Sequence, residues 1–132
     1  MLEIFKVKTS QKVELVDITS LLNKVINDTG INEGIIIVYT PHTTAALTIN
    51  EGADPDVKAD ILNEINKIIP FDDNYRHFEG NSAAHIKSSL FGVSETIIIE
   101  NGRMLLGRWQ KIYFCEFDGP RTREVFIKVI KG

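Results

Sequence analysis

The hydrophobic positions of this chain follow two periods: alternation with polar residues, as in strands, and spacing of three or four residues, as in helices. The alternation predicts most of the fold. Apolar and polar residues alternate over 2–8, as in a half-buried strand whose side chains point to opposite faces. The polar residues 9–11 could turn the chain into a second strand over 12–17, which gives an N-terminal hairpin. The same alternation, or a β-branched run, predicts further strands over 34–40, 43–50, 94–100, 103–106, 111–117 and 122–130.

Apolar residues three and four positions apart predict helices. One follows Asp17 or Thr19, either of which can cap it, and ends before Gly30. A second begins at Asp54-Pro55, an N-cap acid followed by proline, and is stopped by Pro70. Ser82 could cap a short third helix that ends near Gly92.

The order of these elements does not alternate strand and helix. We therefore expect an α+β fold with a curved, mainly antiparallel sheet, two longer helices and one short helix. Asn101-Gly102 predicts a type I′ hairpin turn, because both residues tolerate a positive φ. The polar segment 71–81 is long for a loop in so small a chain, and such loops are often functional.

Composition indicates an ordinary globular protein. The chain has 132 residues, 43% hydrophobic and 25% charged, with a formal net charge of −3. This length predicts a single domain over 1–132, and this charge gives no reason to expect nucleic acid as a partner. No apolar run is long enough to span a membrane, and no signal peptide is recognisable, so the cytoplasm is the expected compartment. The single cysteine, Cys115, lies in an apolar run and is expected to be a buried thiol.

Two of the three histidines, His77 and His85, lie in one polar stretch, RHFEGNSAAHIKSSL. Their eight-residue spacing is not that of a helical zinc pair, but they could converge if the loop folds back over its helix. They would then suit a divalent metal ion, zinc or magnesium, completed by carboxylates. The alternative is that both are solvated or make capping hydrogen bonds.

Other places along the chain also carry candidate chemistry. His42 follows Pro41 where one strand breaks before the next, and the hydroxyls of Thr43 and Thr44 could bind an oxyanion; an exposed polar turn is the alternative. Glu51 lies at a strand end and is a candidate base or ligand. The remaining candidates for contacts with a phosphate or another ligand lie further along the chain: Ser88 after His85, Gln110 after Trp109, and Arg121 in the turn that follows Asp118.

Three long motifs occur in order along the chain: PHTTAALTINEGADPDV, RHFEGNSAAHIKSSLFGVSETI and NGRMLLGRWQKIYFCEFDGPR. With them, nearly the whole chain resembles the YjbQ-like family, which is associated with a secondary thiamine-phosphate synthase activity. The resemblance implies an α+β fold with a small barrel-like sheet. It also implies a homotrimer with sites near the subunit contacts.

The resemblance further implies one pocket that binds a small phosphorylated metabolite. Within it, His42, Glu51 and His85 would be catalytic, and His77 with His85 would bind metal. The implied lining and phosphate contacts also include Thr43, Thr44, Asn81, Ser88, Gln110, Asp118 and Arg121. The implied reaction joins hydroxymethylpyrimidine diphosphate to thiazole phosphate and releases diphosphate. A metal-dependent hydrolase of a phosphorylated metabolite and a non-catalytic trimeric binder of a small anion remain alternatives.

Overall fold

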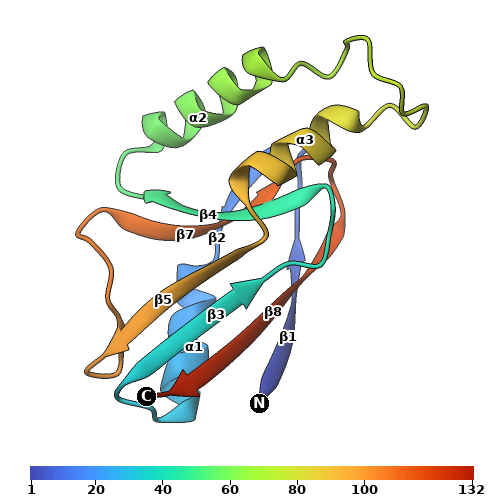
Figure 1. Cartoon of the computed structure of the whole chain (residues 1–132). Helices are drawn as coiled ribbons and strands as arrows, with labels where there is room; N and C mark the ends of the chain where they lie inside the picture. Colours follow the sequence, from blue (N-terminus) through green and yellow to red (C-terminus); the bar gives the residue numbers. More distant parts are fainter.

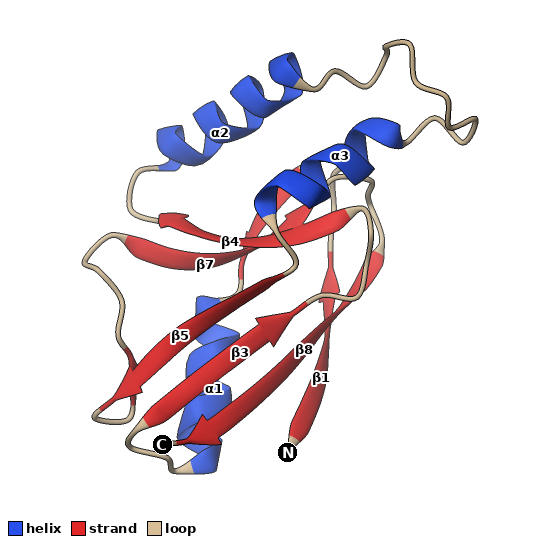
Figure 2. Cartoon of the chain, in the orientation of Figure 1, coloured by secondary structure: helices blue, strands red, loops and turns tan.

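The computed structural model describes residues 1–132 as two antiparallel sheets with three helices (Figures 1 and 2). The larger sheet has the strand order β1-β8-β3-β5-β6, and the smaller sheet has the order β2-β7-β4. Every strand pair is antiparallel, which confirms the α+β expectation. The strands are β1 (Leu2–Lys8), β2 (Glu14–Asp17), β3 (Gly34–Tyr39), β4 (Ala45–Glu51), β5 (Ser94–Glu100), β6 (Arg103–Met104), β7 (Gln110–Glu116) and β8 (Thr122–Lys131).

The helices are α1 (Thr19–Thr29), α2 (Pro55–Ile68) and α3 (Ser82–Phe91). The Asp54 carboxylate accepts the amide of Asp56 at 2.9 Å, so the expected N-cap of α2 is confirmed. The left-handed Gly30 ends α1, also as expected. Asn81 is the N-cap residue of α3, rather than Ser82.

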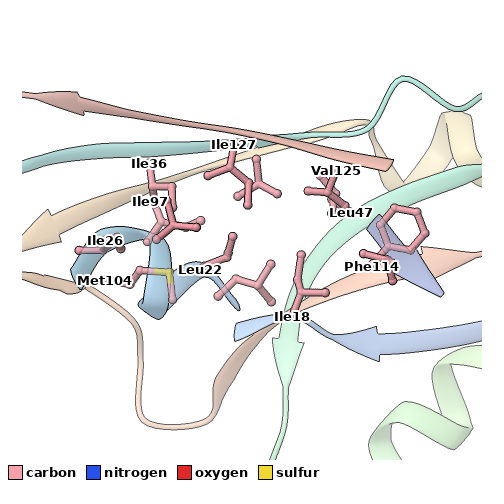
Figure 3. Close-up of a cluster of buried hydrophobic side chains, with 14 of the residues drawn as sticks. Ile18, Leu22, Ile26, Ile36, Leu47, Ile97, Met104, Phe114, Val125 and Ile127 are labelled. Atoms are coloured by element: carbon pink, nitrogen blue, oxygen red, sulfur yellow. The ribbon is translucent and has the colours of Figure 1, made fainter. Parts of the chain in front are cut away.

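The main core lies between the two sheets, and one face of α1 packs against it (Figure 3). The buried face of α1 contributes Leu22 and Ile26, which meet Ile36 and Ile127 of the larger sheet and Phe114 of the smaller one. Burial of these apolar side chains supplies most of the driving force for folding. A second cluster, around Cys115 and Phe117, lies under α3 and contains the expected buried thiol.

Two further local predictions were wrong, and long-range pairing explains the larger error. The expected N-terminal hairpin does not form: β1 pairs with β8, while β2 pairs with β7 in the other sheet. In these pairings β1 packs Phe5 and Val7 on the main core and β2 buries Leu15 in the second cluster, and this burial outweighs the short connection between the two strands. The segment 103–106 is a strand only at Arg103–Met104. The hairpin before it is confirmed, with φ of 53° at Asn101 and 75° at Gly102.

The outer face of the larger sheet carries exposed apolar side chains. These alternate along the strands with the core residues, so they point away from α1. The large exposed side chains on the outer sheet face are Leu2, Ile4, Tyr39, Ile98 and Ile130.

Helix α2 also has no fully buried residue, although it carries an apolar stripe. No helix of the protein is long and apolar enough to cross a membrane.

Candidate functional site

Helices α2 and α3 lie on the same side of the molecule, and the loop that joins them projects beyond the start of α3 before it turns back into that helix (Figure 1). We call this loop, residues 70–81, the strap. A pocket of about 410 Å³ lies between the strap and α3. The strap contributes Tyr75, Arg76 and His77 to its lining, and α3 contributes Ser82, His85 and Ile86.

The pocket brings the two histidines of the sequence motif together. The rings of His77 and His85 meet edge to face, with their centroids 5.6 Å apart. Nε2 of His77 also lies 3.6 Å from a carboxylate oxygen of Glu79. The strap therefore folds back over α3, the condition under which the sequence predicted that these histidines converge.

The first turn of α3 gives the pocket a favourable place for an anion. The carbonyl of Asn81 accepts the amides of Ala84 and His85, but the Asn81 side chain does not cap the helix. The amide of Ser82, which lines the pocket, makes no hydrogen bond within the chain. The amide of Ala83 is also unpaired, but Ala83 is fully buried and does not line the pocket. A free amide and the helix dipole attract negative charge, and the cationic Arg76 also lines the pocket.

A metal ion would find too few ligands in one chain. No group of three or more His, Cys, Asp or Glu side chains is placed to hold one. His77 and His85 supply two imidazoles, whereas catalytic zinc sites use three protein ligands. The donor set therefore fits a metal only if a further ligand comes from a substrate or from another chain.

Asn81 connects the pocket to the turn around residues 118–121. Its side-chain amide donates to the carboxylate of Asp118 at 3.0 Å. The guanidinium of Arg121 donates to the same carboxylate at 2.8 Å. A Cβ on Gly119 would lie 2.4 Å from the carbonyl oxygen of Gln11, so the turn needs glycine for its close packing. The Asp118–Arg121 pair predicted from sequence is present and adjoins the start of α3.

A buried ion pair lies behind this turn. Glu116 and Arg123 are 0% and 3% exposed, and the Arg123 guanidinium donates to both carboxylate oxygens of Glu116. Thr9 donates to Glu116 at 2.7 Å, and Arg123 also donates to the hydroxyl of Thr44 at 2.9 Å. Burial alone would raise the pKa of Glu116, but the hydrogen bonds from Arg123 and Thr9 hold the pKa below its ordinary value.

His42 is fixed beside this pair. Its Nε2 accepts the backbone amide of Glu124 at 2.9 Å, so the neutral ring carries its proton on Nδ1. Burial and the nearby Arg123 guanidinium lower the pKa of His42 below its ordinary value. No hydrogen bond or ion pair joins His42 to His77 or His85.

The lowered pKa of His42 predicts a pH dependence of stability. The unfolded chain binds a proton at His42 more readily than the folded protein, so the free energy of unfolding should fall as pH drops below about 6.5. We expect His42→Gln, which can still accept the Glu124 amide, to lose less stability than the wild type between pH 7 and pH 5. Urea unfolding at several pH values measures this. Equal losses in both proteins would contradict the assignment.

Glu51 and Gln110 do not line the pocket within one chain, contrary to the expectation of a single shared site. They face each other at one end of the β4–β7 pair, whereas Ala45 faces Glu116 at the other end. Six residues of strand separate the two ends by roughly 20 Å. Their side chains also serve local structure: Glu51 accepts the amide of Ala53 at 2.7 Å, and Gln110 accepts that of Gly107 at 2.7 Å.

Two predicted phosphate-binding hydroxyls are buried instead. Ser88 is 4% exposed and donates to the carbonyl of Ala45 at 2.6 Å, which ties α3 to β4. The hydroxyl of Thr44 is also buried and accepts a hydrogen bond from the guanidinium of Arg123. Thr43 is exposed beside the His42 loop and makes no side-chain hydrogen bond within the chain.

Sequence reasoning missed several residues that shape the site. Tyr75 and Arg76 line the pocket, and their position next to His77 was the available signal. The buried roles of Arg123 and Lys87 had no local signal, because a charged residue in a strand or helix is usually exposed.

Residues 3–132 match the family model described as UPF0047 protein YjbQ-like. The chain belongs to the YjbQ-like family. It is 54% identical over 130 residues to a UPF0047 protein of Methanocaldococcus jannaschii, covering 98% of this chain and 94% of that protein. It is 51% identical over 131 residues to the UPF0047 protein YugU of Bacillus subtilis, covering 98% of this chain and 99% of that protein.

Solved structures of similar proteins share the fold of this YjbQ-like chain. A Clostridium acetobutylicum protein of the yjbq/upf0047 family, 53% identical, superposes with a TM-score of 0.95 and covers 97% of this chain and 99% of its own. A conserved hypothetical protein from Thermus thermophilus, 40% identical, gives a TM-score of 0.90 with coverages of 97% and 99%. The family and the fold expected from the sequence motifs are thereby confirmed.

Proposed function

We propose that this YjbQ-like protein is a small-molecule transferase that binds a phosphorylated metabolite between the strap and α3. One observation carries the proposal: two imidazoles, an arginine and Ser82, whose amide is free at the start of α3, line one pocket. Such a set can hold a phosphate and move a proton beside it. The family resemblance favours a thiamine-phosphate synthase-like reaction.

In that reaction the thiazole nitrogen forms a bond to the pyrimidine methylene carbon as the carbon–oxygen bond to diphosphate breaks. Negative charge grows on the leaving diphosphate, so donors that are already in place lower the barrier. Arg76 and the amide of Ser82 would take this role. An imidazolium of His85 or His77 would donate a proton to the leaving oxygen.

A divalent metal ion, magnesium or zinc, remains part of the proposal. His77 and His85 would bind it, with its remaining ligands supplied by the diphosphate or by another chain. When bound, the metal would neutralise phosphate charge. With both rings bound to the metal, the metal would take the place of the imidazolium in stabilising the leaving oxygen. Arg76 and the amide of Ser82 would still orient the substrate.

We also propose that the active form is a cytoplasmic homotrimer, without nucleic acid or membrane partners. The exposed apolar face of the larger sheet is a surface of the kind that subunit contacts cover. A neighbouring chain could also place its Glu51 and Gln110 near the pocket, which one chain cannot do. Sedimentation should give a mass about three times the 14.9 kDa of the chain. A monomeric mass would remove this part of the proposal.

The function is tested by incubating the purified protein with hydroxymethylpyrimidine diphosphate and thiazole phosphate, with and without Mg²⁺ or Zn²⁺. We expect thiamine phosphate and diphosphate to appear in equal amounts, above the blank without enzyme. Diphosphate release without coupling would favour the hydrolase. Ligand binding without any product would favour the non-catalytic binder.

A further inference from the structure

The pocket exists only while the strap lies over α3, because each contributes half of its lining. Between Phe71 and Asn81, the strap makes no hydrogen bond to the rest of the protein. Its bonds are internal: Tyr75 donates through its hydroxyl to the carbonyl of Pro70 and through its amide to the carbonyl of Asp73. The position of Arg76 and His77 therefore depends on how the two ends of the strap are held.

The C-terminal end of the strap is held by the Asn81–Asp118 hydrogen bond. The N-terminal end is held by the ring of Phe71. The ammonium groups of Lys12 and Lys87 each lie 4.1 Å from the centroid of this ring. These distances are those of cation–π contacts. Lys87 comes from α3 and Lys12 from the segment before β2, so the ring links the strap to two separate parts of the body.

Lys87 is unusual for a lysine. It is 0% exposed and has no carboxylate partner; its ammonium contacts only the Phe71 ring and the amide oxygen of Asn66, at the end of α2. Burial, with the nearby Lys12 charge, lowers the pKa of Lys87 to about 8. A buried ammonium without a counter-ion costs folding free energy. Both of its contacts lie at the junction of α2 with the strap, which points to a role in holding that junction.

We propose that Phe71, gripped by Lys12 and Lys87, is a latch that keeps the strap closed and thereby positions Arg76 and His77 in the pocket. The link to ligand binding rests on the proposed function, whereas the link to the strap does not. Phe71 and Lys87 are positioning residues, since neither lines the pocket. Release of the ring would separate His77 from His85 and divide the ligand site.

The test compares four full-length proteins: wild type, Phe71→Ala, Phe71→Tyr and Phe78→Ala. Phe78 is the matched control, because it is in the strap but 94% exposed. Backbone ¹⁵N relaxation over residues 72–80 reports strap mobility, and calorimetry with inorganic diphosphate reports the pocket. We expect the order parameters of residues 72–80 to fall below about 0.6 in Phe71→Ala only. Phe71→Tyr should keep the wild-type order parameters, because tyrosine retains an aromatic ring at this position.

If the strap is then closed less than a tenth of the time, diphosphate should bind at least about tenfold more weakly to Phe71→Ala. Unchanged order parameters in Phe71→Ala, or an equal fall in Phe78→Ala, would overturn the latch. A loosened strap with unchanged diphosphate affinity would overturn its role in the pocket. A wild type that binds no diphosphate, with a strap that loosens in Phe71→Ala, would retain the latch and refute the proposed function.

Discussion

Replacement of Arg123 by alanine should destabilise the protein by about 3–5 kcal/mol, the largest loss expected for any single substitution outside the apolar core. The substitution leaves the fully buried Glu116 carboxylate without its main partner. It also removes the hydrogen bond that Arg123 donates to the hydroxyl of Thr44, the residue before β4. Guanidinium-induced unfolding of the variant and the wild type gives the difference directly.

Arg121→Ala is the matched control for this prediction. Arg121 also pairs with a carboxylate, that of Asp118, but its side chain is 52% exposed. Exposed pairs contribute about 0–1 kcal/mol, so the control should be nearly as stable as the wild type. Similar losses of unfolding free energy for Arg121→Ala and Arg123→Ala would show that the buried pair stabilises the protein no more than the exposed pair does.

Replacement of His85 by alanine should reduce the proposed transferase rate by about 10²–10⁴-fold, the contribution of a lost acid–base group. His85 lines the pocket and contacts His77 there. Stability should change little, because the ring is only half-buried. Product formation measured at saturating substrate gives the rate.

Ser89→Ala is the control, since Ser89 is exposed one turn further along α3 and donates to the carbonyl of His85 rather than lining the pocket. It should keep nearly the full rate. A His85→Ala variant that retained the wild-type rate would remove His85 from catalysis and leave His77 or His42 as the acid–base candidate.

Where the sequence signal was local, the fold could be predicted. Asp54-Pro55 starts α2, Gly30 ends α1 and Asn101-Gly102 makes its turn, because each depends on backbone preferences of the residues themselves. The hairpin over 2–17 failed because strand pairing is chosen by burial across the whole molecule.

The site was predictable in part for the same reason. His77 and His85 are close in sequence, so one fold of the strap brings them together. Glu51 and Gln110 were grouped with them, yet the length of β4 separates them within one chain. The latch of Phe71 with Lys12 and Lys87 joins three distant segments, and no spacing along the sequence indicates it.

The central claim is that the pocket between the strap and α3 binds phosphate groups. The most direct measurement is a titration of the ¹⁵N-labelled protein with inorganic diphosphate, followed by amide chemical shifts. We predict saturable shifts centred on Arg76, His77 and residues 82–85. The absence of saturable shifts at the start of α3, or a saturable response centred elsewhere, would contradict the account.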